Sequence, residues 1–98
     1  MLALINPLEK EKRISAYEKT KGEFNFVFYK AVLTEIENSA KICQTEENSF
    51  EVAEPMFWVN CEENVDNNGM FYYDTTENMI KPIIHEPAPT NIFNSITL

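Results

Sequence analysis

The residues that could carry out chemistry in this chain begin with a single histidine and two cysteines. His85 lies among prolines, and nothing near it in the sequence would orient a nucleophile or an acid against its ring. Cys43 and Cys61 do not form a Cys-x-x-Cys pair, and with His85 they make too few ligands for a structural zinc site. We expect two small, buried, reduced thiols, although one disulfide between them is geometrically possible.

Acidic and glycine-containing segments are the next candidates for a site. Acidic pairs occur at residues 46–47 and 62–63, in segments that read as turns, where carboxylates are usually solvated. Residues 64–69 contain oxygen ligands and a glycine but lack the closing glutamate of a calcium loop. Gly22 and Gly69 are the only glycines, so no glycine-rich loop could cradle a phosphate. The sequence therefore predicts a protein that is not an enzyme and that uses no metal or cofactor.

Charge is distributed unevenly along the 98 residues, whose net charge is −8. Residues 1–30 carry six bases and four acids, a balance of +2, whereas residues 31–98 carry two bases and twelve acids, a balance of −10. This composition disfavours partners such as nucleic acids and acidic membranes, whose phosphates are bound by lysine and arginine. The two halves could attract each other within a molecule or between neighbouring copies, although the acids could also serve solubility alone.

Size and hydrophobicity place the chain among small folded proteins. The hydrophobic fraction is 44% and the aromatic fraction 12%, which suffice for one thin core and are too high for a disordered chain. The apolar start, Met1–Ile5, is shorter than the apolar part of a secretory signal, and no apolar stretch has the length needed to cross a bilayer. We expect a soluble single domain that folds in a reducing cytoplasm.

The segment 1–22 carries the signals of a helix. Asn6 could cap it, Pro7 suits the first helical position, and Glu9 stands where it could complete a capping box. Gly22 would end the helix. The apolar positions form only a sparse stripe, so we expect such a helix to gain little from its own domain and to lie on a neighbouring molecule.

Residues 23–36 fit two kinds of element. Phe24, Phe26 and Phe28 alternate with other side chains at the period of two that is typical of a strand. The same segment also fits a helical stripe, made of Phe24, Val27, Phe28, Ala31 and Val32. We favour the strand because Phe, Val and Tyr are concentrated here, and the helix remains the alternative.

Downstream, short apolar segments alternate with turn residues. We expect strands at 40–45, 50–52 and 56–61, and a hairpin in which 70–73 and 79–84 flank the loop 74–78. The fold class that follows is mainly β, a small antiparallel sheet or sandwich of about five or six short strands, with an N-terminal helix and an extended C-terminal arm.

The chain divides into three parts on this interpretation. Residues 1–22 form the N-terminal helix or extension, and residues 23–84 form the β-rich domain. Residues 85–98 form a Pro-rich, extended C-terminal arm, because closely spaced prolines favour extended backbone.

Aromatic residues of the strands and apolar residues of the C-terminal arm are the candidate protein-binding residues. Alternation places Trp58 and Tyr72 on the strand faces opposite to Phe57 and Tyr73, so one set should fill the core and the other could form an interface. Both sets could instead lie in the core of a small sandwich. The end of the chain is apolar where a free tail would be polar, which indicates docking by Ile92, Phe93, Ile96 and Leu98.

A series of aromatic strands and turns runs through residues 30–89. It consists of Phe50-Glu51-Val52, Phe57-Trp58-Val59-Asn60-Cys61, the spacer Glu62-Glu63-Asn64-Val65, Phe71-Tyr72-Tyr73-Asp74 and the exit Lys81-Pro82-Ile83. In this series the chain resembles a loose family of short proteins encoded among the virion genes of tailed bacteriophages. Those proteins begin near the strand here written Ala31-Val32-Leu33, so residues 1–29 would be an extension. The shared motifs are structural, and no functional residue is carried over from them.

The resemblance implies a virion structural protein, such as a capsid decoration protein, a minor capsid protein, or a head–tail or tail component. Its partners would be the major capsid protein, other virion proteins or further copies of itself, and it would be assembled in the host cytoplasm. The alternative hypothesis is a small acidic phage inhibitor that occupies the nucleic-acid groove of a host protein by presenting carboxylates in place of phosphates. Neither hypothesis involves nucleic acid or a membrane as a partner.

Overall fold

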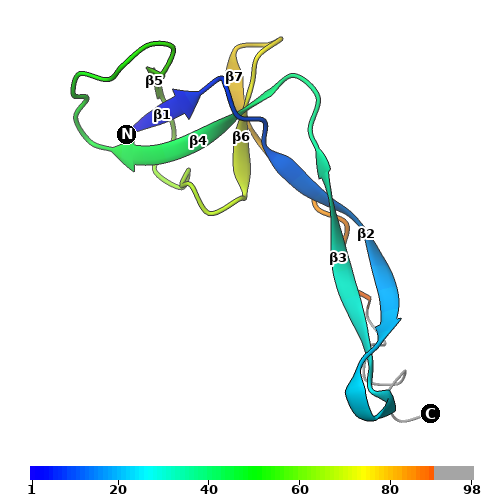
Figure 1. The fold of residues 1–98 in the computed structure, drawn as a ribbon. Helices are drawn as coiled ribbons and strands as arrows, with labels where there is room; N and C mark the ends of the chain where they lie inside the picture. Colours follow the sequence, from blue (N-terminus) through cyan, green and yellow to red (C-terminus); the bar gives the residue numbers. More distant parts are fainter. Residues whose placement is uncertain (90–98) are drawn as a thin grey trace.

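The chain forms a small β-sheet head from which a long β-hairpin arm extends (Figure 1). The computed structural model describes residues 1–89, of which 12–35 form the arm and the remainder form the head. The molecule measures 55 × 24 × 23 Å along its principal axes, and the tip of the arm lies far from the head. The expectation of a mainly β fold is confirmed, with an architecture more elongated than a sandwich.

The head is a curled antiparallel sheet of five strands, in the order β5-β1-β4-β6-β7. The strands are β1 (Leu2–Asn6), β4 (Ser39–Glu46), β5 (Phe57–Asn60), β6 (Phe71–Asp74) and β7 (Met79–Pro82). β4 joins the two halves of the sheet, because its residues 41–46 pair with β1 and its first two residues pair with β6. β5 and β7 are therefore the two edges of the curled sheet.

The core lies on the inner face of this sheet. Alternation along β1 sends Ala3 and Ile5 inward, and both are fully buried. They pack with Ile42 of β4 and Tyr73 of β6, and Phe57 of β5 meets the Tyr73 ring edge-on at 5.4 Å. The predicted alternation of aromatic residues is thus confirmed for the inward-facing set.

The arm is a two-stranded sheet of β2 (Lys12–Lys21) and β3 (Val27–Glu35). The strands pair antiparallel from Lys12 opposite Glu35 to Lys21 opposite Val27, with one irregularity between Ile14 and Ala16. No residue from 12 to 35 is buried, so the arm has no core of its own. Its stability comes from the ladder and from the contacts at its base.

The prediction of an N-terminal helix over 1–22 is wrong. Instead of capping a helix, Asn6 ends β1 and forms a turn, in which its Oδ1 accepts a hydrogen bond from the Leu8 amide at 3.0 Å. An Asn-Pro pair suits such a turn as well as a helix start. The residues that follow form a strand because pairing with the β-branched and aromatic side chains of β3 outweighs a weak helical stripe.

The predictions of strands in the rest of the chain are confirmed in part. The strand interpretation of 23–36 is correct for β3, whereas residues 23–25 form the short 3-10 turn η1 (Glu23–Asn25) at the arm tip. The strand at 40–45 and the hairpin around 74–78 are also present, as β4 and as β6–β7. The strand expected at 50–52 is absent, because these residues belong to the loop between β4 and β5.

Ser39 organises the junction at which both legs of the arm leave the head. It is the buried polar residue of the described chain, with 4% of its surface exposed. Its hydroxyl donates to the Ile36 carbonyl at 2.6 Å and accepts from the Glu11 amide at 2.9 Å. A further bond from the Ile36 amide to the Glu11 carbonyl closes the junction. One side chain thus links β4 to both legs.

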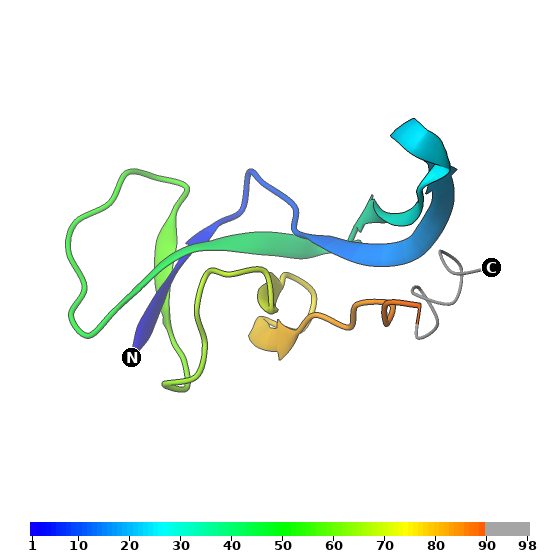
Figure 2. The ribbon, with the colours of Figure 1, turned by 90° about the horizontal axis from the view of Figure 1, so that it is seen from below.

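Residues 83–89, which follow β7, run along the base of the arm (Figure 2). The Glu86 amide donates to the Ile14 carbonyl at 2.7 Å, and Arg13 Nε donates to the Ile84 carbonyl at 2.7 Å. These bonds use the edge of β2 that β3 leaves free. The predicted C-terminal arm therefore begins by packing on the chain's own hairpin.

Candidate protein-binding sites

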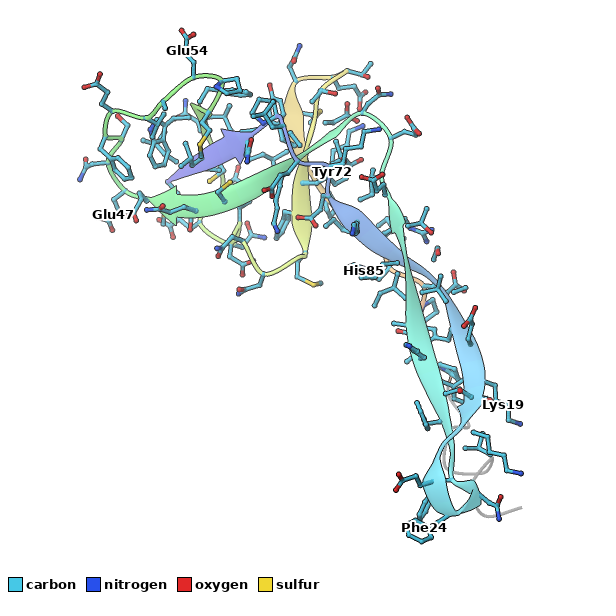
Figure 3. All side chains as sticks on the ribbon, viewed as in Figure 1. Lys19, Phe24, Glu47, Glu54, Tyr72 and His85 are labelled. Atoms are coloured by element: carbon cyan, nitrogen blue, oxygen red, sulfur yellow. The ribbon has the colours of Figure 1, made fainter. Side chains whose placement is uncertain are left out.

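Three phenylalanine rings are exposed at the tip of the arm, and we call them the tip aromatics. They are Phe24, Phe26 and Phe28, with exposed fractions of 88%, 58% and 46%. Figure 3 shows Phe24 at the extreme end of the hairpin, directed away from the rest of the molecule. Exposed apolar side chains grouped in this way are typical of a surface that another molecule covers.

The backbone of the tip holds Phe24 outward at an energetic cost. Phe24 and Asn25 have φ angles of 57° and 64°, which is the left-handed region at both central positions of the turn. Asparagine tolerates this region, whereas phenylalanine does so at a cost of roughly 1 kcal/mol. The turn suits the right-handed twist of the strands, and it closes with the Phe26 amide donating to the Glu23 carbonyl. The arrangement keeps the most exposed aromatic ring of residues 1–89 directed away from the rest of this range.

Gly22 allows the tip to close tightly beneath these rings. Its amide donates to the Phe26 carbonyl at 2.7 Å. A Cβ atom at this position would lie 2.9 Å from Cε1 of Phe28, closer than side chains ordinarily approach. The glycine predicted to end a helix instead makes room for an aromatic ring.

The arm and the head carry net charges of opposite sign. The arm carries five bases and three acids, a balance of +2, whereas residues 1–11 and 36–89 carry three bases and thirteen acids, a balance of −10. The division foreseen along the sequence is therefore also a division in space, since arm and head are different parts of the fold (Figure 3). A basic arm and an acidic head attract each other when they belong to different molecules.

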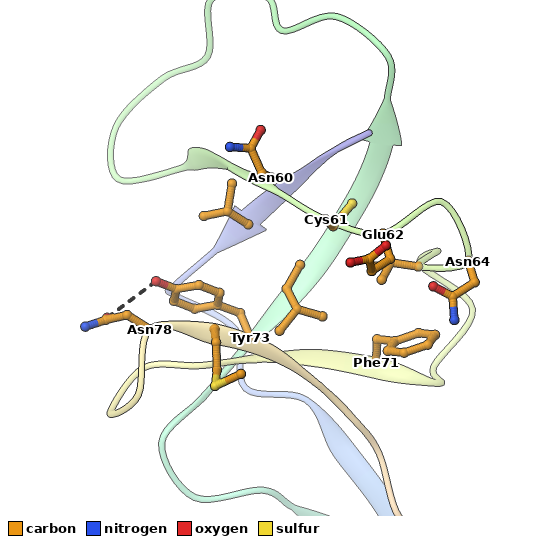
Figure 4. A pocket seen from close by; sticks show the side chains of 11 residues that line it. Asn60, Cys61, Glu62, Asn64, Phe71, Tyr73 and Asn78 are labelled. Atoms are coloured by element: carbon orange, nitrogen blue, oxygen red, sulfur yellow. Dashed lines mark hydrogen bonds between the residues drawn. The ribbon is translucent and has the colours of Figure 1, made fainter.

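The head contains a pocket of about 520 Å³ between its two edges (Figure 4). Val59 and Cys61 line it from β5 and the segment that follows, and Phe71, Tyr73 and Ile80 line it from the hairpin β6–β7. The Tyr73 hydroxyl, at the rim, donates to Asn78 Oδ1 at 3.4 Å. The pocket is thus an apolar hollow with a few polar groups, in the size range of roughly 300–1,000 Å³ that is usual for ligand sites.

The electrostatic setting of this pocket is acidic. Glu62 is the charged residue in its lining, and the exposed Glu63 follows it directly. Burial raises the pKa of the Cys61 thiol, the N-terminal amine opposes this rise and Glu62 adds to it. Cys61 therefore stays protonated and behaves as part of the apolar wall.

Trp58 and Tyr72, the candidates proposed from the sequence, lie away from this pocket. Trp58 Nε1 donates to the Phe50 carbonyl at 2.9 Å, and the two rings meet edge-on at 5.1 Å. Trp58 thereby anchors the loop that precedes β5. Tyr72 is half-buried on β6, opposite Lys81 of β7. β1 and β4 separate the strands of the two residues, so the structure does not bring them together.

The remaining sequence candidates lie outside the described residues. They are Ile92, Phe93, Ile96 and Leu98. Sequence reasoning missed the tip aromatics as a site because it assigned them to an ordinary strand. The available signal was the local sequence Phe24-Asn25-Phe26, which places an asparagine, a residue that favours turns, between aromatic rings.

His85 is a structural residue at the base of the arm. Its Nδ1 accepts from the Ile14 amide at 3.0 Å, and its Nε2 lies 2.8 Å from the Gly69 carbonyl. Because an amide can only donate, Nδ1 is unprotonated and Nε2 carries the hydrogen. Both ring nitrogens are thus engaged by backbone groups.

No cluster of three or more His, Cys, Asp or Glu side chains in residues 1–89 could hold a metal ion. No helix in this range is long and apolar enough to span a membrane. Cys43 and Cys61 are free thiols, both half-buried.

Comparisons with protein-family models, with curated proteins and with solved structures found no match to the chain.

Proposed function

We propose that this chain is a bacteriophage virion structural protein that acts by binding other proteins through its arm. The observation that carries the proposal is the group of exposed tip aromatics at the end of a hairpin without buried residues. Such a hairpin adds no buried side chain to the core of the head, yet it presents large apolar rings well beyond the head. Aromatic side chains are the usual anchors of protein interfaces.

The setting of a virion agrees with the size and shape of the molecule. In a symmetric shell or tail, many copies repeat the same contact, so a small interface is sufficient for assembly. The partners would be the major capsid protein, another virion protein or a further copy of the chain. The protein would act in the particle after assembly in the host cytoplasm, without catalysis and without a cofactor.

Mass spectrometry of purified virions tests this proposal. The chain should be present in many copies per particle, and a virion assembled with a Phe24→Ser variant should contain far fewer copies of it. A Leu8→Ser variant is the matched control, because Leu8 is 77% exposed and lies on the head. If virions that contain every other structural protein lack the chain, the proposal is wrong.

The acidic head favours a second candidate, an inhibitor that mimics nucleic acid. Its balance of −10 could occupy a basic groove of a host protein. Ionic strength distinguishes the two functions, because a complex held by carboxylates dissociates as salt rises. A complex held by the tip aromatics persists under the same conditions. The inhibitor hypothesis leaves the tip aromatics without a role, so we rank it second.

A further inference from the structure

We propose that the aromatic tip of the arm inserts into the head pocket of a second copy of the chain, so that copies associate head to tail. This inference rests on the proposed protein-binding function and names the partner. It joins two features that residues 1–89 leave uncovered: the apolar rings at the tip of the arm and the apolar pocket of the head.

The tip aromatics and the pocket of the head match in chemistry, since both are apolar. Phe24 is the most exposed large apolar side chain among the described residues, at 88%. The hollow, of about 520 Å³, is lined by rings and aliphatic groups, including Phe71, Tyr73 and Ile80. Figure 4 shows the Phe71 and Tyr73 rings flanking its interior. Aromatic rings prefer edge-on or offset contacts with one another, which a ring entering this hollow could make.

Charge favours the same pairing. Lys19 and Lys21 precede the tip on β2 and are exposed, and Lys30 follows it on β3. The acids of this stretch are Glu23 at the tip and Glu18, which lies opposite Lys30 in the ladder, so three bases stand against two acids. The rim of the pocket carries Glu62. Docking would therefore bring a basic collar around the tip against an acidic rim, which orients the encounter and opposes wrong partners.

A tip cannot reach the pocket of its own molecule. β2 and β3 form a continuous ladder whose ten-residue strand β2 spans about 33 Å at the usual rise per residue. The base of this ladder is fixed to the head by Ser39 and by His85. The tip is therefore held away from its own head, and only the tip of another copy can enter the pocket.

The contact would be heterologous, because one molecule contributes the tip and the other contributes the pocket. Each copy retains a free tip at one end and a free pocket at the other, so the contact repeats and forms a ring or an open chain. This mode of growth suits a component of a symmetric particle.

Sedimentation velocity of the purified full-length chain tests the inference. The wild type should form oligomers whose size rises with concentration. Phe24→Ser should weaken the association by about thirty-fold or more, the loss expected for an interface anchor. Leu8→Ser should leave it unchanged. Far-UV circular dichroism of each variant confirms that the head is folded.

Charge reversal provides a second, independent arm of the test. Lys21→Glu and Glu62→Lys should each weaken the association, and the chain that carries both should recover it. An equimolar mixture of the two single variants should associate again, with the two variants in alternation, since the tip of each then complements the pocket of the other. Glu54→Lys, on an exposed loop of the head, is the control for charge alone.

Photo-cross-linking locates the contact. Benzoylphenylalanine at position 24, mixed with ¹⁵N-labelled wild-type chain, should cross-link to the labelled chain at pocket residues such as Phe71 and Met79. Cross-links elsewhere, occupation of the pocket by residues 90–98, or a monomer at every concentration would each overturn the inference. None of these results removes the proposed function, which the virion experiment tests separately with partners other than the chain itself.

Discussion

Nδ1 of His85 lies 3.0 Å from the backbone nitrogen of Ile14, so a residue near the end of the described chain holds the base of the arm. The same ring reaches the Gly69 carbonyl in the loop before β6. Three segments that are distant in sequence thus meet at one imidazole. Because both ring nitrogens bind backbone groups, the contact depends on one tautomer of the neutral ring.

Replacing His85 by alanine should loosen the arm without unfolding the head. The Ile14 amide would lose its acceptor, and the adjacent bond from the Glu86 amide to Ile14 would weaken with it. Amide hydrogen exchange should therefore accelerate at Ile14 and Glu86, while the core amides of Ile5 and Ile42 keep their rates. Glu86→Ala, which retains the backbone bond, is the control. Unchanged exchange at Ile14 would show that the imidazole does not hold the arm.

Ser39→Ala should destabilise the protein by about 1–3 kcal/mol, the cost of leaving buried polar groups without partners. The substitution leaves the Ile36 carbonyl and the Glu11 amide without the hydroxyl that they share. Urea unfolding measures the change in the free energy of unfolding. Ser49→Ala is a suitable comparison because Ser49 is exposed. Equal stability of the two variants would contradict the role assigned to Ser39.

Asp74 should make the stability of the head depend on acidic pH. Its hydrogen bond with Lys81 at 3.0 Å, aided by the Thr76 amide, lowers the pKa of the carboxyl below its ordinary value of 3.8. The stabilisation is fully present above that ordinary value and is lost as pH falls through the lowered pKa. Asp74→Asn should remove this part of the acid dependence, measured as the thermal midpoint between about pH 5 and pH 2. A Glu54→Gln variant should retain the wild-type profile.

A substitution in the core should lower the stability of the protein strongly, whereas a substitution at the tip should hardly change it. Ile5→Ala should cost about 2–5 kcal/mol, because Ile5 is fully buried and its truncation leaves a cavity. Phe24→Ser should change the free energy of unfolding by no more than about 0.5 kcal/mol, as expected for an exposed position. Chemical denaturation of both variants gives the comparison. A large loss of stability for Phe24→Ser would mean that the ring packs within its own molecule.

The β-rich character of the head could be predicted from the sequence because its strands show their local pattern. The alternation through Phe57 and Trp58, and through Tyr72 and Tyr73, correctly separated the inward side chains from the others. The hairpin β6–β7 was predictable for the same reason, since its turn residues follow directly on its strand.

The first strand of the arm, β2, could not be predicted, since it depends on its pairing with β3. Asn6-Pro7 is compatible with a helix start and with a turn, and only the pairing of β2 with β3 decides between them. The candidate site was missed for a related reason. Whether Phe24 lies in a core or at a free tip depends on what the hairpin packs against, and this information is not local. The pocket likewise combines residues from β5, β6 and β7, which meet only because the sheet curls.

Because no residue between positions 12 and 35 is buried, the arm can become longer or shorter without disturbing a core. Each residue added to or removed from both strands changes the reach of the tip by about 3.3 Å, and nothing in the head has to repack. Adding a single residue pair also turns the outward face of the terminal rings to the opposite side, whereas adding two restores it. The reach of the tip and the side to which its rings point can therefore change in discrete steps during evolution, while the head stays the same.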